Sequence, residues 1–152
     1  MRFIHSFSRV ALITVSLLAV SAVAQEQKIT ARDVPAAVMT AFKTAYPNAT
    51  IRGYAREKEK GKVFYEIESR EGTTTRDVLY NPDGTVAEVE ESVAASDLPA
   101  EVQRAFKEKY PKAVITRAER TTAGDKVSYE IVARQGKRRV TLEVDSSGRV
   151  LK

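Results

Sequence analysis

The sequence predicts an α+β protein made of two tandem repeats, each with one helix packed on an antiparallel meander of three to four strands. Two observations lead to this prediction. A series of residues recurs at a constant offset of 64 positions, which indicates a duplicated unit. Within each copy, apolar residues first recur with the period of a helix and then alternate with the period of a strand. A helix followed by short-looped sequential strands favours a layered α+β unit.

The repeat is visible in matched segments along the whole second part of the chain. Asp33-Val34-Pro35-Ala36 returns as Asp97-Leu98-Pro99-Ala100, and Lys62-Val63-Phe64-Tyr65-Glu66-Ile67 returns as Lys126-Val127-Ser128-Tyr129-Glu130-Ile131. We expect the first repeat at residues 33–93 and the second at residues 97–152, with a polar lead at residues 25–32. Since a unit of about 60 residues is marginally stable alone, we expect the two to pack together or to share one sheet.

The helix of each repeat is predicted from an apolar stripe. In the first repeat, Val34, Val38 and Phe42 recur at helical spacing, and we interpret the aromatic residue as core. Asp33 stands where an N-cap belongs, with Pro35 in the first turn. Tyr46-Pro47 ends the helix, because the residue before a proline is disfavoured in the α conformation.

Four strands are predicted after the first helix, at residues 49–59, 62–71, 74–81 and 85–91. Residues 81–84 and 145–148 have the composition of tight turns, with a glycine for the positive φ angle. Residues 81–84 faintly resemble a calcium loop, but the twelve-residue ligand pattern is missing, so we interpret them as a turn. Short connections between sequential strands predict an antiparallel meander.

The first 24 residues have the pattern of a secretory signal peptide. Arg2 and Arg9 give a positive start, residues 10–20 are uncharged and apolar, and Ala22-Val23-Ala24 fits a cleavage site. The apolar run is short for a membrane span. We therefore expect cleavage after Ala24, a periplasmic or secreted protein, and no stable membrane anchor after cleavage.

The composition excludes several enzyme classes. The 152 residues carry a net charge of +5, no Cys and one His, and that His5 lies in the predicted signal peptide. The mature chain therefore cannot use Ser-His-Asp or Cys-His catalysis. It also cannot hold a metal ion through His or Cys ligands. Glu66 and Glu68 form a carboxylate pair, which we interpret as part of a solvated sheet face. We predict that the protein is not an enzyme and that it has no catalytic residue, no metal site and no cofactor.

Charge differs between the repeats. Residues 33–94 hold 8 basic and 11 acidic side chains, whereas residues 97–152 hold 13 basic and 8 acidic ones. Lys137-Arg138-Arg139 is a short basic cluster that we interpret as a solvated turn, with contact to an anionic lipid or wall polymer as the alternative. Export argues against nucleic acid as a partner.

The helix segment at residues 33–49, with its Pro-x-x-Val-x-x-Ala-Phe…Tyr-Pro pattern and the following strands, resembles the PepSY-like, or beta-lactamase-inhibitor-like, domain family. The pattern occurs in both repeats. The resemblance implies a helix-backed sheet in a small exported bacterial protein. Members often carry an aromatic residue, commonly Trp, in the first strand; Tyr54 stands in this strand here, while the second repeat has Ala118.

We expect the sheet face opposite the helices to bind a protein. Apolar and charged residues mixed on one face are typical of such surfaces, and the candidates are Tyr54, Phe64, Glu66, Leu79, Arg120 and Glu130. An alternative is that Tyr54, Phe64 and Leu79 seal the two repeats together.

The predicted function is that of an exported, non-enzymatic, inhibitor-like binding module, with a cell-envelope protein such as a peptidase as its partner. The alternative is a sensor of a small molecule or envelope signal, with a groove between the repeats lined by Tyr54, Tyr80 and Leu79.

Overall fold

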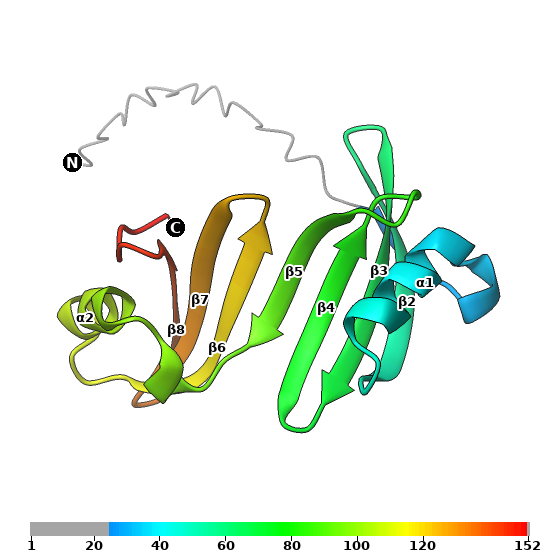
Figure 1. The fold of residues 1–152 in the computed structure, drawn as a ribbon. Coiled ribbons are helices and arrows are strands. Elements are labelled where there is room, and N and C mark those ends of the chain that lie inside the picture. Colours follow the sequence, from blue (N-terminus) through cyan, green and yellow to red (C-terminus); the bar gives the residue numbers. More distant parts are fainter. Residues whose placement is uncertain (1–24, 152) are drawn as a thin grey trace, which may run out of the picture.

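The computed structural model describes residues 25–151, and the predicted signal peptide at residues 1–24 lies outside the described residues. The described chain forms one antiparallel sheet whose eight strands follow the order of the sequence (Figure 1). The predicted α+β meander is therefore confirmed, and the two repeats share a continuous sheet. The strands are β1 Gln25–Lys28, β2 Thr50–Glu59, β3 Lys62–Glu71, β4 Thr74–Tyr80, β5 Val86–Ser92, β6 Val114–Ala123, β7 Lys126–Gln135 and β8 Arg138–Asp145.

Each repeat has its own hydrophobic core between one helix and its strands. Helix α1, Ala36–Ala45, buries Val38 and Phe42 against the strands of the first repeat. Helix α2, Ala100–Lys109, does the same with Val102 and Phe106 in the second. The strand residues that complete the two cores lie at matching positions and are Ile67, Val78 and Tyr80 in the first repeat and Ile131, Leu142 and Val144 in the second.

The start of the first helix differs from the sequence prediction. Asp33 is not the N-cap of α1, because Pro35 occupies that position without a side-chain hydrogen bond. Asp33 instead ends a short 3-10 turn, Ala31–Asp33, where its Oδ2 accepts hydrogen bonds from the Thr30 backbone N–H at 2.9 Å and the Thr30 hydroxyl at 2.8 Å. The chain therefore makes a capped turn before the helix.

Strand β1 was not predicted, because residues 25–32 carry a polar pattern. It pairs antiparallel with β2, and Lys28 lies opposite Ala55. Arg56 of β2 donates a hydrogen bond to Gln27 at 2.6 Å. The lead thus adds a short outer strand to the first repeat.

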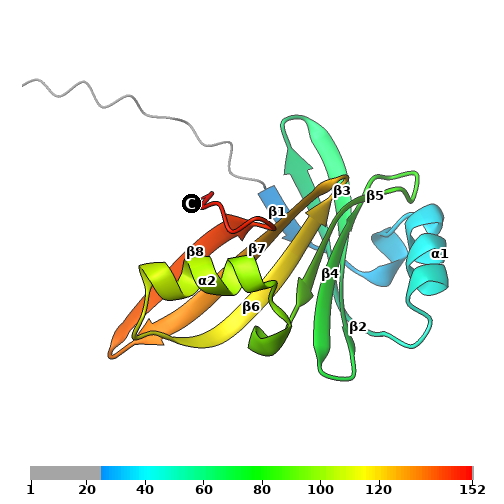
Figure 2. The same ribbon diagram turned by 60° about the vertical axis from the view of Figure 1, so that its left-hand side comes forward.

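Strand β5 joins the repeats by pairing with β6. Val89, which packs against the first core, lies opposite Thr122, and Thr122 lies opposite Val127 of the second core. Since directly opposed residues project to the same face of a sheet, α1 and α2 lie on the same face. Figure 2 shows the helices over opposite ends of the sheet, with the strands of the junction between them.

The β4–β5 turn touches α1. Gly84 has a φ angle of +88°, and a Cβ atom added there would lie 2.8 Å from the Ala37 carbonyl oxygen. Gly148 makes the same approach to the first turn of α2. Glycine is thus required at these two turns both for the backbone angle and for close packing.

Candidate protein-binding face

The face of the sheet turned away from both helices is called the open face. Phe64, Glu66 and Leu79 lie on it, as predicted. Glu66 is directly opposite Leu79, and Phe64 precedes Glu66 by two positions on β3. All three side chains are partly buried. The first repeat therefore brings an aromatic, an aliphatic and an acidic residue together.

Glu130 also lies on the open face, in the second repeat. It stands between Glu119 of β6 and Glu143 of β8 in one row across the sheet. Arg117 of β6 pairs with Glu130 at 2.9 Å and with Glu119 at 3.0 Å. The second half of the face is consequently a mixed-charge surface.

Two predicted site residues lie on the other face. Tyr54 is opposite Ile67 and packs against the first core. Arg120 is opposite Glu91 and Tyr129 on the helix side. Their assignment to the open face is wrong.

The cause is one extra residue in each strand. Counting alternate residues from the core residue Ile51 places Tyr54 on the open face, but the register shifts between Ile51 and Gly53. The same register shift occurs between Ile115 and Arg117 in β6, and it places Arg120 on the helix side of the sheet. A bulge that inserts one residue exchanges the faces of all later residues in the strand.

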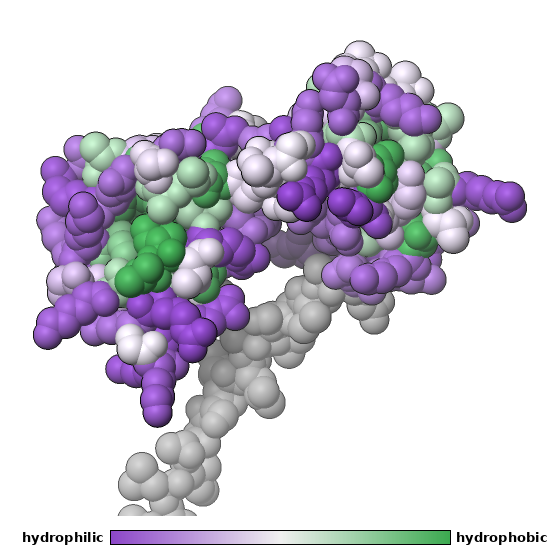
Figure 3. Space-filling view, turned by 90° about the horizontal axis from the view of Figure 1, so that it is seen from below, coloured by the Kyte–Doolittle hydropathy of each residue, from purple (hydrophilic) through white to green (hydrophobic). Residues whose placement is uncertain are grey.

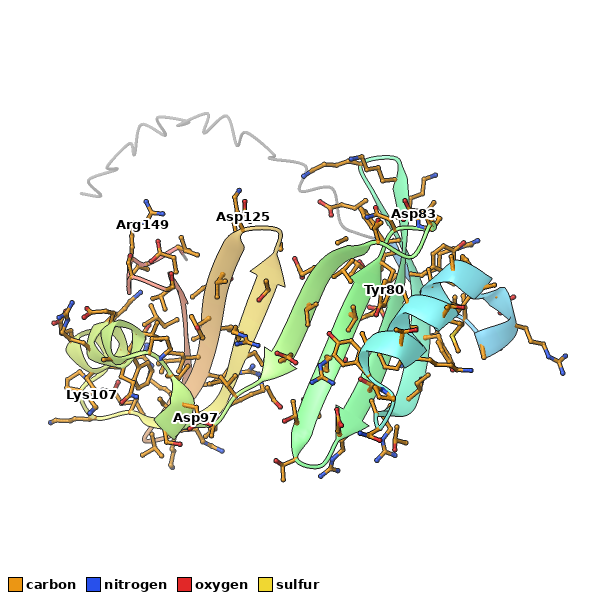
Figure 4. All side chains as sticks on the ribbon, in the orientation of Figure 1. Tyr80, Asp83, Asp97, Lys107, Asp125 and Arg149 are labelled. Atoms are coloured by element: carbon orange, nitrogen blue, oxygen red, sulfur yellow. The ribbon has the colours of Figure 1, made fainter. Side chains whose placement is uncertain are left out.

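The predicted groove lined by Tyr54, Tyr80 and Leu79 does not form. Tyr80, the last residue of β4, is fully buried in the first core, and Figure 4 shows it beside α1. Tyr54 shares the helix side with Tyr80, whereas Leu79 is on the open face. The three side chains therefore cannot line one pocket.

Additional carboxylates make the open face of the first repeat acidic. Glu68, Asp77 and Glu90 stand side by side on β3, β4 and β5. Glu88 lies opposite Leu79, and Glu57 lies opposite Phe64. Glu88 and Glu90 are not among the residues predicted for this face, although alternation along residues 86–92 is a signal that places them there.

These carboxylates influence one another's ionisation. Burial, together with the negative charges of Glu57 and Asp77, raises the pKa of Glu66 to about 7. Burial and the neighbouring Glu119 raise the pKa of Glu90, also to about 7. Burial followed by repulsion from other carboxylates likewise raises the pKa of Asp77 and of Glu88. The face thus holds more negative charge than its surroundings stabilise.

Within residues 25–151, no group of three or more acidic, His or Cys side chains is arranged to hold a metal ion. Among the same residues, no helix is long and apolar enough to cross a membrane.

A cluster of charged residues marks the junction on the helix side. Glu91 accepts hydrogen bonds from Arg76 of the first repeat and Arg120 of the second. The Arg76 guanidinium lies 4.1 Å from the centre of the Tyr46 ring. A pocket of about 600 Å³ adjoins the cluster, and Val93 contributes to its wall. The β5–β6 pairing and this ion-pair cluster join the repeats, and Tyr54, Phe64 and Leu79 lie on other strands.

Hydrophobic residues on the surface gather into local groups (Figure 3). Seen from below, hydrophilic residues cover most of both halves, and hydrophobic ones form separate groups (Figure 3). A second pocket, of about 730 Å³, lies beside Asp125 and Arg149 of the second repeat and is also lined by Glu88 of the first; its walls combine polar and apolar surface (Figure 4). These surfaces suit a partner with polar and charged groups.

The fold and the open face define a tandem helix-and-sheet protein in which residues 25–151 leave one surface of the sheet uncovered. The chain belongs to the family described as "putative beta-lactamase-inhibitor-like, PepSY-like", whose model matches residues 21–86 and 65–152. The predicted resemblance is confirmed. A comparison with curated protein sequences returned no match.

Solved structures share the fold. A "putative periplasmic protein" from Bacteroides eggerthii is 21% identical, with a TM-score of 0.63, over 78% of this chain and 86% of that one. A "BLIP-like protein" from Bacteroides fragilis is 23% identical, with a TM-score of 0.59, over 78% and 84% of the respective chains. A "DUF2874 family protein" from Bacteroides ovatus is 22% identical, with a TM-score of 0.60, over the same shares.

Proposed function

We propose that this protein is an exported, non-enzymatic binding module that holds a protein of the cell envelope, such as a peptidase, on its open face. The observation that carries the proposal is the uncovered sheet surface on which Phe64 and Leu79 stand among carboxylates. The family's beta-lactamase-inhibitor-like description, and the description of a neighbour of the same fold as a periplasmic protein, support an extracytoplasmic binding role.

The composition of the face indicates how it would bind. Phe64 and Leu79 supply apolar area that loses water on contact, and partly buried aromatic anchors contribute much of the affinity of protein interfaces. The surrounding carboxylates repel one another, which the raised pKa of Glu66 reflects. A partner with basic side chains would relieve this repulsion, so a basic and partly apolar surface fits best.

A capture experiment tests the proposal. The chain from residue 25 onward is immobilised and exposed to an envelope extract of the producing organism, and retained proteins are identified by mass spectrometry. We expect a specific protein to be retained by the unmodified chain and lost with the double variant Phe64→Ala/Leu79→Ala. Circular dichroism would verify that the variant is folded.

The matched control removes exposed apolar side chains elsewhere. Val86 and Val150 are 53% and 48% exposed, and the variant Val86→Ala/Val150→Ala should retain the partner. Equal retention by both double variants would show that the open face is not the binding surface.

A further inference from the structure

The sheet has a free edge at β8. Strand β8 is last in the strand order, and among residues 25–151 no strand pairs with its outer side. Only its C-terminal end is covered: Val150 bridges to Val144, and the Leu151 backbone N–H donates to the Glu143 carbonyl at 2.8 Å. Figure 2 shows β8 at the outer end of the sheet.

In the first repeat, the strand that corresponds to β8 is β4, and its outer side is occupied by β5. With the offset of 64, Val150 and Val144 correspond to Val86 and Tyr80, which form the first pair of β5 on β4. Beyond this pair, β5 continues along β4, while the corresponding part of β8, residues 139–142, pairs with β7 on one side and has no strand on its outer side among the described residues. The second repeat thus presents the edge of a four-stranded unit with the fourth place largely open.

The backbone of this edge is oriented for pairing. The Glu143 carbonyl points outward, because it accepts the Leu151 N–H. Since backbone groups alternate along an antiparallel strand, the N–H and C=O groups of Arg139 and Thr141 point outward too. Among the described residues, the Thr141 carbonyl accepts one long hydrogen bond, from the Tyr110 hydroxyl at 3.5 Å. These groups can receive an added strand.

The charges of the edge select an acidic strand. Lys137, Arg138 and Arg139 are exposed and form no ion pair within residues 25–151. The strand in the matching place is acidic: Glu91 and Glu90 of β5 lie opposite Arg76 and Asp77 of β4.

These partners define where an added strand would meet the cations. The counterparts of Arg76 and Asp77 on β8 are Val140 and Thr141. Acidic residues opposite Val140 and Thr141 would be diagonal neighbours of Arg138 and Arg139, within reach of long side chains. Two copies of β8 would instead bring their own arginines together.

We propose that the β8 edge binds an extended acidic segment of a partner protein by strand addition, in the place that β5 takes on β4. This interaction is independent of the open face. Lys137, Arg138 and Arg139 also limit unwanted association, because a charged edge disfavours pairing with neutral strands and with a second copy of the chain.

The probe is an acetylated and amidated peptide with the sequence of residues 87–94, which includes the acidic part of β5. It is added at millimolar concentration to the ¹⁵N-labelled chain from residue 25 onward, and amide hydrogen exchange is followed by NMR. We expect slower exchange at the N–H groups of Arg139 and Thr141, with the amides of β1 unchanged.

Two N-methylated peptides test the backbone pairing. Glu90 lies opposite Asp77, the counterpart of Thr141, so the even-numbered residues of the probe should face β8. Methylation at the positions of Glu90 and Ser92 should abolish protection, and methylation at those of Val89 and Glu91 should preserve it. Equal behaviour of the two peptides would overturn strand addition.

Charge reversal tests the specificity. Arg138→Glu/Arg139→Glu should weaken peptide binding by about threefold to tenfold, while Lys43→Glu on α1 should leave it unchanged. Absence of protection with the unmodified peptide would overturn the proposal. Protection of Arg139 and Thr141 that rises with protein concentration alone would also overturn it, because a second copy would then fill the edge.

Discussion

The Arg76 Nε atom lies 2.6 Å from the Glu91 Oε1 atom, and both side chains are largely buried, with 11% and 16% exposure. Glu91 is the shared acceptor for cations of both repeats, since Arg120 binds its other oxygen. Burial alone would raise the pKa of Glu91, but hydrogen bonds from Arg76 and Arg120 outweigh it and lower the pKa below its ordinary value. The contribution of this carboxylate to stability is therefore present above its unfolded-state pKa and lost as the pH falls through the folded-state value.

Glu91→Gln should lower the free energy of unfolding by about 2 kcal/mol, because it removes the near counter-charge of the buried Arg76 guanidinium and leaves only the longer contact with Glu71, at 3.6 Å. Urea denaturation at pH 7 would measure the change. Glu101→Gln is the matched control: its ion pair with Arg104 on α2 is exposed, and its loss should cost less than about 0.5 kcal/mol. Equal costs would mean that the junction pair contributes no more than a surface pair.

Glu66→Gln should remove a pH dependence of stability. The folded-state pKa of Glu66, raised to about 7, lies above the ordinary value of 4.5, so the folded state favours the protonated carboxyl. Its stabilising contribution is full below the unfolded-state value and is lost as the pH rises through about 7. Since the side chain is partly exposed and screened, we expect a gain of only about 1 kcal/mol for the variant at pH 8.

Urea denaturation of Glu66→Gln at pH 5 and pH 8 would measure this difference, with Glu108→Gln on the exposed side of α2 as control. If Glu66→Gln gained the same stability at both pH values, the gain would not come from the ionisation of Glu66, and the raised pKa of this carboxyl would not explain it.

Tyr80→Phe should be neutral or stabilising by up to about 1 kcal/mol. The Tyr80 hydroxyl is buried and has no hydrogen-bond partner among the described residues, so its removal eliminates a desolvation cost without creating a large cavity. Thermal unfolding followed by circular dichroism would measure the effect. A loss of more than about 1 kcal/mol would indicate that the hydroxyl has a bound partner in solution.

Gly84→Ala should destabilise more than Gly72→Ala, by about 1–3 kcal/mol. Both glycines have positive φ angles, but a Cβ atom at Gly84 would meet the Ala37 carbonyl, while one at Gly72 would meet open space. Chemical denaturation would measure the free energy of unfolding of both variants. Because both share the backbone strain of a positive φ angle, the difference between them reports the packing against α1. If both variants lost the same free energy of unfolding, α1 would have moved to accommodate the added Cβ atom without a loss of stability.

Elements with strong local patterns could be predicted from the sequence. The bounds of β3, residues 62–71, follow from its alternation and its flanking glycine turns. The end of α1 before Tyr46-Pro47 follows from the restriction that proline places on the preceding residue. These features depend on neighbouring residues alone.

The faces of β2 and β6 could not be predicted by alternation. Gly53 was the one hint of a bulge, since an isolated glycine inside a strand often marks one, but the second repeat has Arg117 at this position. The pairing of β5 with β6 and the role of Glu91 depend on contacts between the repeats. Local patterns carry no information on such contacts, so they do not reveal the role of Glu91. Arg120 lies on the helix side because of the extra residue in β6.

The most direct test of the binding role is carboxyl footprinting of the protein alone and with its captured partner. Carbodiimide labelling of each acidic side chain would be read by mass spectrometry. We expect the partner to protect Glu66, Asp77 and Glu90 on the open face, while the labelling of Glu101 and Glu108 on α2 is unchanged. Protection of the α2 carboxylates with full labelling of Glu66, Asp77 and Glu90 would contradict this expectation.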